Sequence, residues 1–234
     1  MADCAHRFEN GENGNPPAIK YLWIYVTEEG LERKRAAEDS GPRLSDEDWL
    51  NIIDEACSLG AEWMIIYVGA RLSECPEVWR MCDWAQQEYE MRVGLHLSGN
   101  CLRASELEYL FKLDSERTYV VADEADAAAL ETLRERGVNV CVANVRKPAD
   151  AKRCESPEVM ACVGIDGELF TCGLVLGVEE YQLGNVQGEP LQKLIKDQSL
   201  RHAVSDIPAY RGHDHNCDGC PPHIARRAAE SLPE

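Results

Sequence analysis

The chain has 234 residues, 44% hydrophobic and 7% aromatic, which is enough for a core in one large domain or two modest ones. Its 24 basic and 42 acidic residues give a net charge of −18, which argues against a nucleic acid or an anionic membrane as partner. No apolar run reaches the roughly 18 residues of a membrane span. Residues 1–19 are polar and lack a secretory signal, so we expect a flexible leader and a cytoplasmic protein.

Residues 20–150 alternate apolar runs with amphipathic stretches, which predicts an α/β domain with a parallel sheet and right-handed crossovers. One helix has clear end signals, because Ser45 can serve as its N-cap and Gly60 can end it. The predicted strands are 21–27, 62–69, 92–98, 117–124 and 138–145, and the predicted helices are 45–60, 76–90, 105–114 and 126–137.

The loop of residues 28–44 is the long connection of this domain, and it follows the first strand. The C-terminal ends of strands are where α/β folds usually place their chemistry. The basic run Arg33, Lys34 and Arg35 could hold an anionic ligand or an acidic partner there. Such a run is also typical of a solvated helix face.

The alternating pattern ends near residue 150, where Pro148 and mixed charges mark a boundary. A small α+β domain is expected over residues 151–225, followed by a tail over 226–234. Within it, Asp166-Gly167 joins two short apolar runs and predicts a β-hairpin. With a two-residue turn, Ile165 would pair with Glu168 and Ala161 with Cys172.

Eleven cysteines are many for such a chain, and the odd number without a secretory signal makes a disulfide framework an unsuitable explanation. Cys57 on a predicted helix and Cys141 in a predicted strand are expected to be core thiols. Cys75 and Cys82 flank a helix start without a third ligand nearby, so we interpret them in the same way.

Cys217 and Cys220 form a C-x2-C pair in a polar turn and need further ligands from upstream. The candidates are Cys154, Cys162 and Cys172. In the expected hairpin register Cys162 pairs with Thr171 and points away from Cys172, because side chains alternate along a strand. The proposed set is therefore Cys154, Cys172, Cys217 and Cys220.

Four thiolates suit either Zn²⁺ or an iron–sulfur cluster. Zinc ribbons use two C-x2-C knuckles, whereas here one pair is separated by 17 residues, which favours a cluster. His213, His215 and His223 lie close to the C-x2-C pair in sequence, and we expect them at the surface or beside the ligands.

The order Cys154, Gly167, Cys172, "LGNV" at 183–186 and Cys217-x2-Cys220 resembles the auxiliary-cluster domain of radical SAM enzymes, the SPASM or twitch domain. No cysteine follows Cys220, which matches the shorter twitch form with one auxiliary [4Fe–4S] cluster. The resemblance covers roughly residues 20–223. It implies that residues 20–150 form a truncated parallel β/α barrel and residues 151–225 the twitch domain.

The resemblance fails at the family's catalytic motif. Radical SAM enzymes carry C-x3-C-x2-C after the first strand, and these positions fall on Gly30, Lys34 and Ala37, in a loop without any cysteine. The family's Gly-Gly-Glu-Pro motif, which helps to hold S-adenosylmethionine, falls on residues 68–71 and places Ala70 where the acidic residue is expected. We therefore expect no S-adenosylmethionine site and no radical SAM cluster.

These observations predict a non-catalytic radical SAM-like protein with one cluster, which passes electrons to a partner enzyme or docks against it. A non-redox module that binds a peptide or protein and has a structural Fe–S or zinc site is the alternative. A replaced enzymatic activity is a third possibility. Its candidate residues near the strand ends, each also suited to a loop or cap, are Glu28, Glu29, His96 and Asp123.

Overall fold

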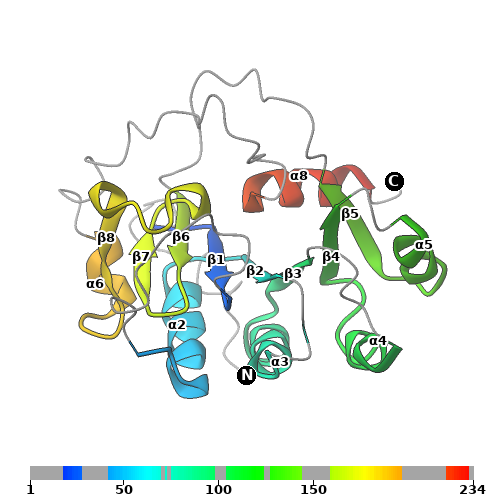
Figure 1. The fold of residues 1–234 in the computed structure, drawn as a ribbon, viewed down its shortest axis with the longest axis horizontal. Helices are drawn as coiled ribbons and strands as arrows, with labels where there is room; N and C mark the ends of the chain where they lie inside the picture. Colours follow the sequence, from blue (N-terminus) through cyan, green and yellow to red (C-terminus); the bar gives the residue numbers. More distant parts are fainter. Residues whose placement is uncertain are drawn as a thin grey trace, which may run out of the picture.

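The computed structural model describes residues 18–27, 42–69, 72, 75–97, 104–123, 127–143, 159–196 and 220–231. One eight-stranded sheet organises them, with the order β5-β4-β3-β2-β1-β6-β7-β8 (Figure 1). Strands β1 to β6 run parallel to their neighbours, and β7 and β8 add an antiparallel edge. The strands are β1 (Tyr21–Tyr25), β2 (Trp63–Gly69), β3 (Arg92–Leu97), β4 (Thr118–Asp123), β5 (Asn139–Ala143), β6 (Met160–Val163), β7 (Glu168–Phe170) and β8 (Gln182–Asn185).

Helices lie on both sides of this sheet. Figure 1 shows α2, α3, α4 and α5 on one face and α8 across the other, where α8 packs on β1, β2 and β5. The helices are α2 (Asp46–Ser58), α3 (Glu77–Tyr89), α4 (Ala104–Leu110), α5 (Ala127–Glu135), α6 (Leu191–Lys196) and α8 (Pro221–Ser231), with 3-10 turns η4 (Gly173–Val175) and η5 (Glu179–Tyr181). None of the helices in the described ranges has the length and apolar composition that a membrane span requires.

The five predicted β/α units are confirmed, each within a few residues of its expected bounds. Helix α2 begins where its signals predict, because the Ser45 side chain accepts a hydrogen bond from the Asp48 amide and Asp48 accepts one from the Ser45 amide in return. The helix ends at Leu59, and Gly60 follows with a φ of 103°, which an L side chain rarely adopts.

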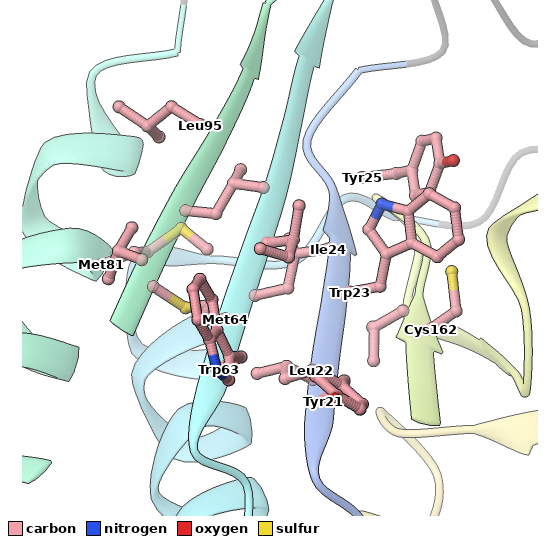
Figure 2. Packing of buried hydrophobic residues seen from close by; sticks show 14 of the residues in the cluster. Tyr21, Leu22, Trp23, Ile24, Tyr25, Trp63, Met64, Met81, Leu95 and Cys162 are labelled. Atoms are coloured by element: carbon pink, nitrogen blue, oxygen red, sulfur yellow. The ribbon is translucent and has the colours of Figure 1, made fainter. Parts of the chain in front are cut away.

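Strand β1 lies at the centre of the sheet and separates two different packing layers. Leu22 and Ile24 are fully buried and face the helix layer, together with Met64 on β2 (Figure 2). Trp23 and Tyr25 are buried on the opposite face, which we call the inner face because α8 covers part of it. This alternation results from the period of two along a strand that is buried on both sides.

The hairpin differs from its expected register by one residue. Cys162 pairs with Phe170 and Val163 with Leu169, whereas the two-residue turn required Val163 to face Phe170. The Gly164 carbonyl accepts a hydrogen bond from the Gly167 amide, and Gly167 has a φ of 81°. The connection is therefore a three-residue loop with a left-handed glycine, and the predicted two-residue turn was wrong.

Strand β6 pairs in parallel with β1, so the hairpin extends the sheet of the five β/α units. The predicted domain boundary near residue 150 lies outside the described residues and stays a prediction. The sheet has two edges, at β5 and β8. The chain thus has an α/β fold with a mostly parallel sheet.

The "LGNV" stretch ties the hairpin turn to β8. Asn185 donates a hydrogen bond from its side-chain amide to the Asp166 carbonyl at 2.9 Å and accepts one from the Gln187 amide at 2.8 Å. Gly184, at a φ of 148°, leaves room for Leu194 of α6, since a Cβ atom at 184 would stand 2.6 Å from that side chain. Gly184 and Asn185 of the "LGNV" stretch therefore have a structural role.

Candidate metal centre

Two of the four predicted ligands lie within the described residues, and both are buried. Cys172 is 7% exposed and extends the line of β7 in an extended conformation, just before η4. Cys220 is 6% exposed and directly precedes α8, where its carbonyl accepts a hydrogen bond from the Ile224 amide. Its Sγ lies 3.9 Å from the Sδ of Met160 on β6. Cys154 and Cys217 lie outside the described residues.

Tyr25 lies beside the end of the hairpin that carries Cys172. A Cβ atom on Gly173 would stand 2.5 Å from the Tyr25 hydroxyl, so the peptide after Cys172 packs directly against the phenol. Burial raises the pKa of the Tyr25 hydroxyl well above its usual range, and the negative charge that neighbouring groups can carry raises it further: Cys162, Cys172, Tyr67 and Cys220. Cys172 and Cys220 therefore both lie within electrostatic range of Tyr25.

Cys162 also lies on the inner face, although the expected hairpin register had it pointing away from Cys172. Its pairing with Phe170 places the two side chains on the same face of the sheet. Figure 2 shows Cys162 on the side of Trp23 and Tyr25. The expected Cys162–Thr171 pair was therefore wrong, and strand alternation does not separate Cys162 from Cys172. Cys162 is fully buried within β6, between β1 and β7.

An aromatic row leads from this point across the inner face. Trp23 and Tyr25 have ring centroids 5.5 Å apart, Tyr25 and Tyr67 stack at 4.9 Å, and Tyr67 meets His96 edge-on at 5.1 Å. The Trp23 Nε1 and His96 Nδ1 atoms are enclosed without a hydrogen-bond partner in the described part of the chain. Sequence reasoning missed this row, although the alternation in "YLWIYV" placed Trp23 and Tyr25 on one face.

The other predicted site residues are distributed as follows. Val68 and Gly69 end β2, whereas the remaining positions aligned with radical SAM motifs lie outside the described residues: Gly30, Lys34, Ala37, Ala70 and Arg71. Glu28, Glu29 and the basic run Arg33, Lys34 and Arg35 are also outside them, and so is the side chain of Asp123. His96 is therefore the enzymatic candidate whose surroundings are visible.

The remaining described cysteines belong to the core. Cys75, Cys82 and Cys141 are buried thiols outside any disulfide, and burial raises the pKa of Cys82 well above its usual range. Cys57 is 1% exposed but disulfide-bonded, so the expectation of a core thiol was wrong at this position. Within the described residues, no three Cys, His, Asp or Glu side chains form a group that could hold a metal ion.

The donor set nevertheless fits a sulfur-coordinated centre. Cys172 and Cys220 supply thiolate sulfur, the ligand that both iron–sulfur clusters and Zn²⁺ accept. The Thr171 hydroxyl, buried directly before Cys172, finds no hydrogen-bond partner among the described residues. Because side chains alternate along an extended segment, this hydroxyl points away from the face that Cys172 shares with Cys162.

The mostly parallel eight-stranded sheet gives the chain a radical SAM-like fold, and the likeness concerns the fold alone. Two solved proteins have similar structures. BtrN, crystallised in an open conformation, is 14% identical with a TM-score of 0.55, over 87% of this chain and 92% of BtrN. SuiB of Streptococcus suis is 11% identical with a TM-score of 0.52, over 83% of this chain and 69% of SuiB. No protein-family model and no curated protein sequence matches the chain.

Proposed function

We propose that this protein is a non-catalytic, radical SAM-like accessory protein that binds one [4Fe–4S] cluster through Cys154, Cys172, Cys217 and Cys220. The observation that carries the proposal is the burial of two predicted ligands next to the inner face. Cys172 directly precedes the glycine that packs on Tyr25, and Cys220 directly precedes α8, which covers part of that face. A cluster supplies one-electron redox chemistry when bound, and the four thiolates would hold it with no iron left open.

The absence of a radical SAM cluster is part of the proposal. Residues 28–44 contain no cysteine, so the loop after the first strand has no thiolate for a cluster that chelates S-adenosylmethionine. SuiB has been crystallised with S-adenosylmethionine and with its precursor peptide SuiA, and these complexes describe SuiB. For this chain we propose a protein partner, an enzyme subunit or a redox protein, in the cytoplasm. The charge of −18 favours a basic docking surface on that partner.

The decisive experiment is anaerobic purification followed by iron, sulfide and zinc analysis and a redox titration followed by EPR. We expect about four irons and four sulfides per chain, the content of a single [4Fe–4S] centre, and a reducible signal. Zinc in place of iron, or a cluster that cannot be reduced, would contradict electron transfer and favour a structural site in a binding module.

A second measurement tests the missing activity. Cluster-loaded protein is incubated anaerobically with dithionite and S-adenosylmethionine, and the products are separated by chromatography. We expect no 5′-deoxyadenosine above the level of a Cys217→Ala control. Its formation, or about eight irons per chain, would mean that other residues hold a second cluster.

A further inference from the structure

A pocket of about 320 Å³ lies at the opposite end of the strands from the loops that follow them. Its floor comes from the first residues of β1 and β2 and from β4, with Tyr21, Trp63 and Tyr119 all buried. Helix α8 forms the opposite wall with small or compact side chains: Pro222, Ala225, Ala228 and Ala229. The volume is at the lower end of the range typical of small-molecule sites.

The rim of this pocket is positively charged in a strongly acidic protein. Lys20, Arg92 and Arg226 oppose the single carboxylate Glu62, which leaves a net charge of +2 among the lining residues. Lys20 already pairs with Glu62 at 3.7 Å, and both side chains are about half exposed, so the pair is weak. Arg92 is therefore the cation of the rim on which an anion would act most directly.

Arg92 is placed to receive an anion. Its guanidinium lies over the Trp63 ring, with the central carbon 5.5 Å from the ring centroid. No carboxylate of the described residues lies within ion-pair distance of it. Burial raises the pKa of Tyr119, and the positive charge of Arg92 acts against this increase. The guanidinium and the phenol are therefore within electrostatic range of each other.

The second arginine belongs to the helix side of the pocket. Arg226 lies on α8 and is one of the lining residues. A ligand between α8 and the sheet would meet Arg92 on the sheet side and the apolar side chains of α8 on the other. An arginine fork binds a carboxylate or phosphate with two parallel hydrogen bonds.

We propose that this pocket binds a small aromatic oxyanion, with its carboxylate or phosphate on Arg92 and its ring between the Trp63–Tyr119 floor and the small side chains of α8. The site is separate from the cysteines around Tyr25 and does not depend on the proposed cluster. Its volume is sufficient for a single ring with a short anionic group.

The test is ligand-observed NMR on the full-length, anaerobically purified chain, with benzoate and phenyl phosphate as probes and benzamide as the neutral analogue. We expect saturable binding of at least one anion and about tenfold weaker binding of benzamide, equivalent to about 1.4 kcal/mol. Saturable binding of both anions would show that the pocket recognises the oxyanion in general. A preference for benzoate or for phenyl phosphate would show whether a carboxylate or a phosphate is recognised. Equal binding of benzamide and the anions, or no saturation by either anion, would overturn the proposal.

Three variants locate the site. Arg92→Gln removes the exposed charge and should weaken the anion about tenfold, whereas Arg134→Gln, on α5 and remote from the pocket, should leave binding unchanged. Ala225→Leu fills the pocket with a good helix former and should abolish binding while both arginines remain. Equal behaviour of Arg92→Gln and Arg134→Gln, or undiminished binding by Ala225→Leu with an unchanged circular dichroism spectrum, would place the ligand elsewhere.

Discussion

The Gly173 backbone lies against the Tyr25 phenol so closely that a Cβ atom at residue 173 would be 2.5 Å from the hydroxyl oxygen and 3.0 Å from the Trp23 ring. Both rings are buried on the central strand and stand in the aromatic row, so they have little freedom to withdraw. The contact connects the cysteine at the end of the hairpin with the middle of the sheet.

We expect Gly173→Ala to destabilise the protein by about 1–3 kcal/mol, the usual cost of forcing an extra methyl group into a packed interior. The displaced Cys172 should also lower the iron content. Urea unfolding and iron analysis measure the two effects. Gly188→Ala is the matched control, because a Cβ atom there would meet only an ordinary contact at 3.7 Å. Equal stability of the two variants would contradict the packing argument.

The ligand set is tested by single cysteine replacements. Replacing Cys154, Cys172, Cys217 or Cys220 by Ala should lower the iron content per chain, because one iron loses its thiolate. Cys162→Ala should keep the iron content near that of the unmodified protein, because the resemblance to the twitch domain, although not the strand alternation, assigns this ligand position to Cys154. Since Cys162 shares the inner face with Cys172, this variant is the sharpest of the series. If Cys162→Ala loses iron and Cys154→Ala retains it, Cys162 is a ligand and Cys154 is not.

We expect the protein to lose stability in mild acid because His96 is buried. Its surroundings lower the pKa from 6.5 to about 4, because burial disfavours the charged imidazolium. Between these pH values the unfolded chain binds a proton that the folded chain does not. The stabilising contribution is therefore complete above pH 6.5 and is lost progressively as the pH falls to about 4.

The size of this contribution is about 1–3 kcal/mol, since part of the ring remains exposed. The measurement is urea unfolding at about pH 7, 5.5 and 4.5, which together span this window, compared between the unmodified protein and His96→Phe. Phenylalanine keeps a ring at the edge of Tyr67, so the difference isolates the proton. Parallel pH profiles of the two proteins would show that His96 is accessible to protons in the folded state.

Asn185 is expected to hold the hairpin turn on β8. Asn185→Ala removes its bonds to Asp166 and Gln187 and should cost about 1–3 kcal/mol, because partly buried backbone groups lose their partners. Asn185→Asp keeps the acceptor for Gln187 and should cost less. Limited proteolysis of residues 159–196 and urea unfolding measure the loss. Equal destabilisation by Ala and Asp would attribute the effect to the lost donor alone.

The β/α units could be predicted from the sequence because each carries its own local signal. The apolar run at 21–27 and the cap formed by Ser45 and Asp48 are properties of neighbouring residues, and the structure reproduces both. The order of the strands is not local, since nothing within β6 indicates that it pairs with β1.

The hairpin register shows where sequence reasoning became ambiguous. Asp-Gly favours a two-residue turn, but a glycine in the left-handed conformation also serves the three-residue loop that starts at Gly164. The choice depends on Asn185, which reaches the Asp166 carbonyl from β8. Because the observed register differs by one residue from the expected one, Cys162 lies on the same face as Cys172 and not on the opposite face. The aromatic row and the arginine pocket likewise depend on strand pairing and could not be predicted.

The position of β1 between β2 and β6 has a consequence for synthesis on the ribosome. Strand β1 finds one neighbour, β2, at Trp63–Gly69, but its other neighbour, β6, begins only at Met160. Until then its second edge stays unpaired, which exposes the chain to wrong pairing with other nascent chains. The surroundings of Tyr25 form only after β6, because Cys172 and Cys220 follow it, so the proposed cluster could be loaded only once Cys220 has been synthesised.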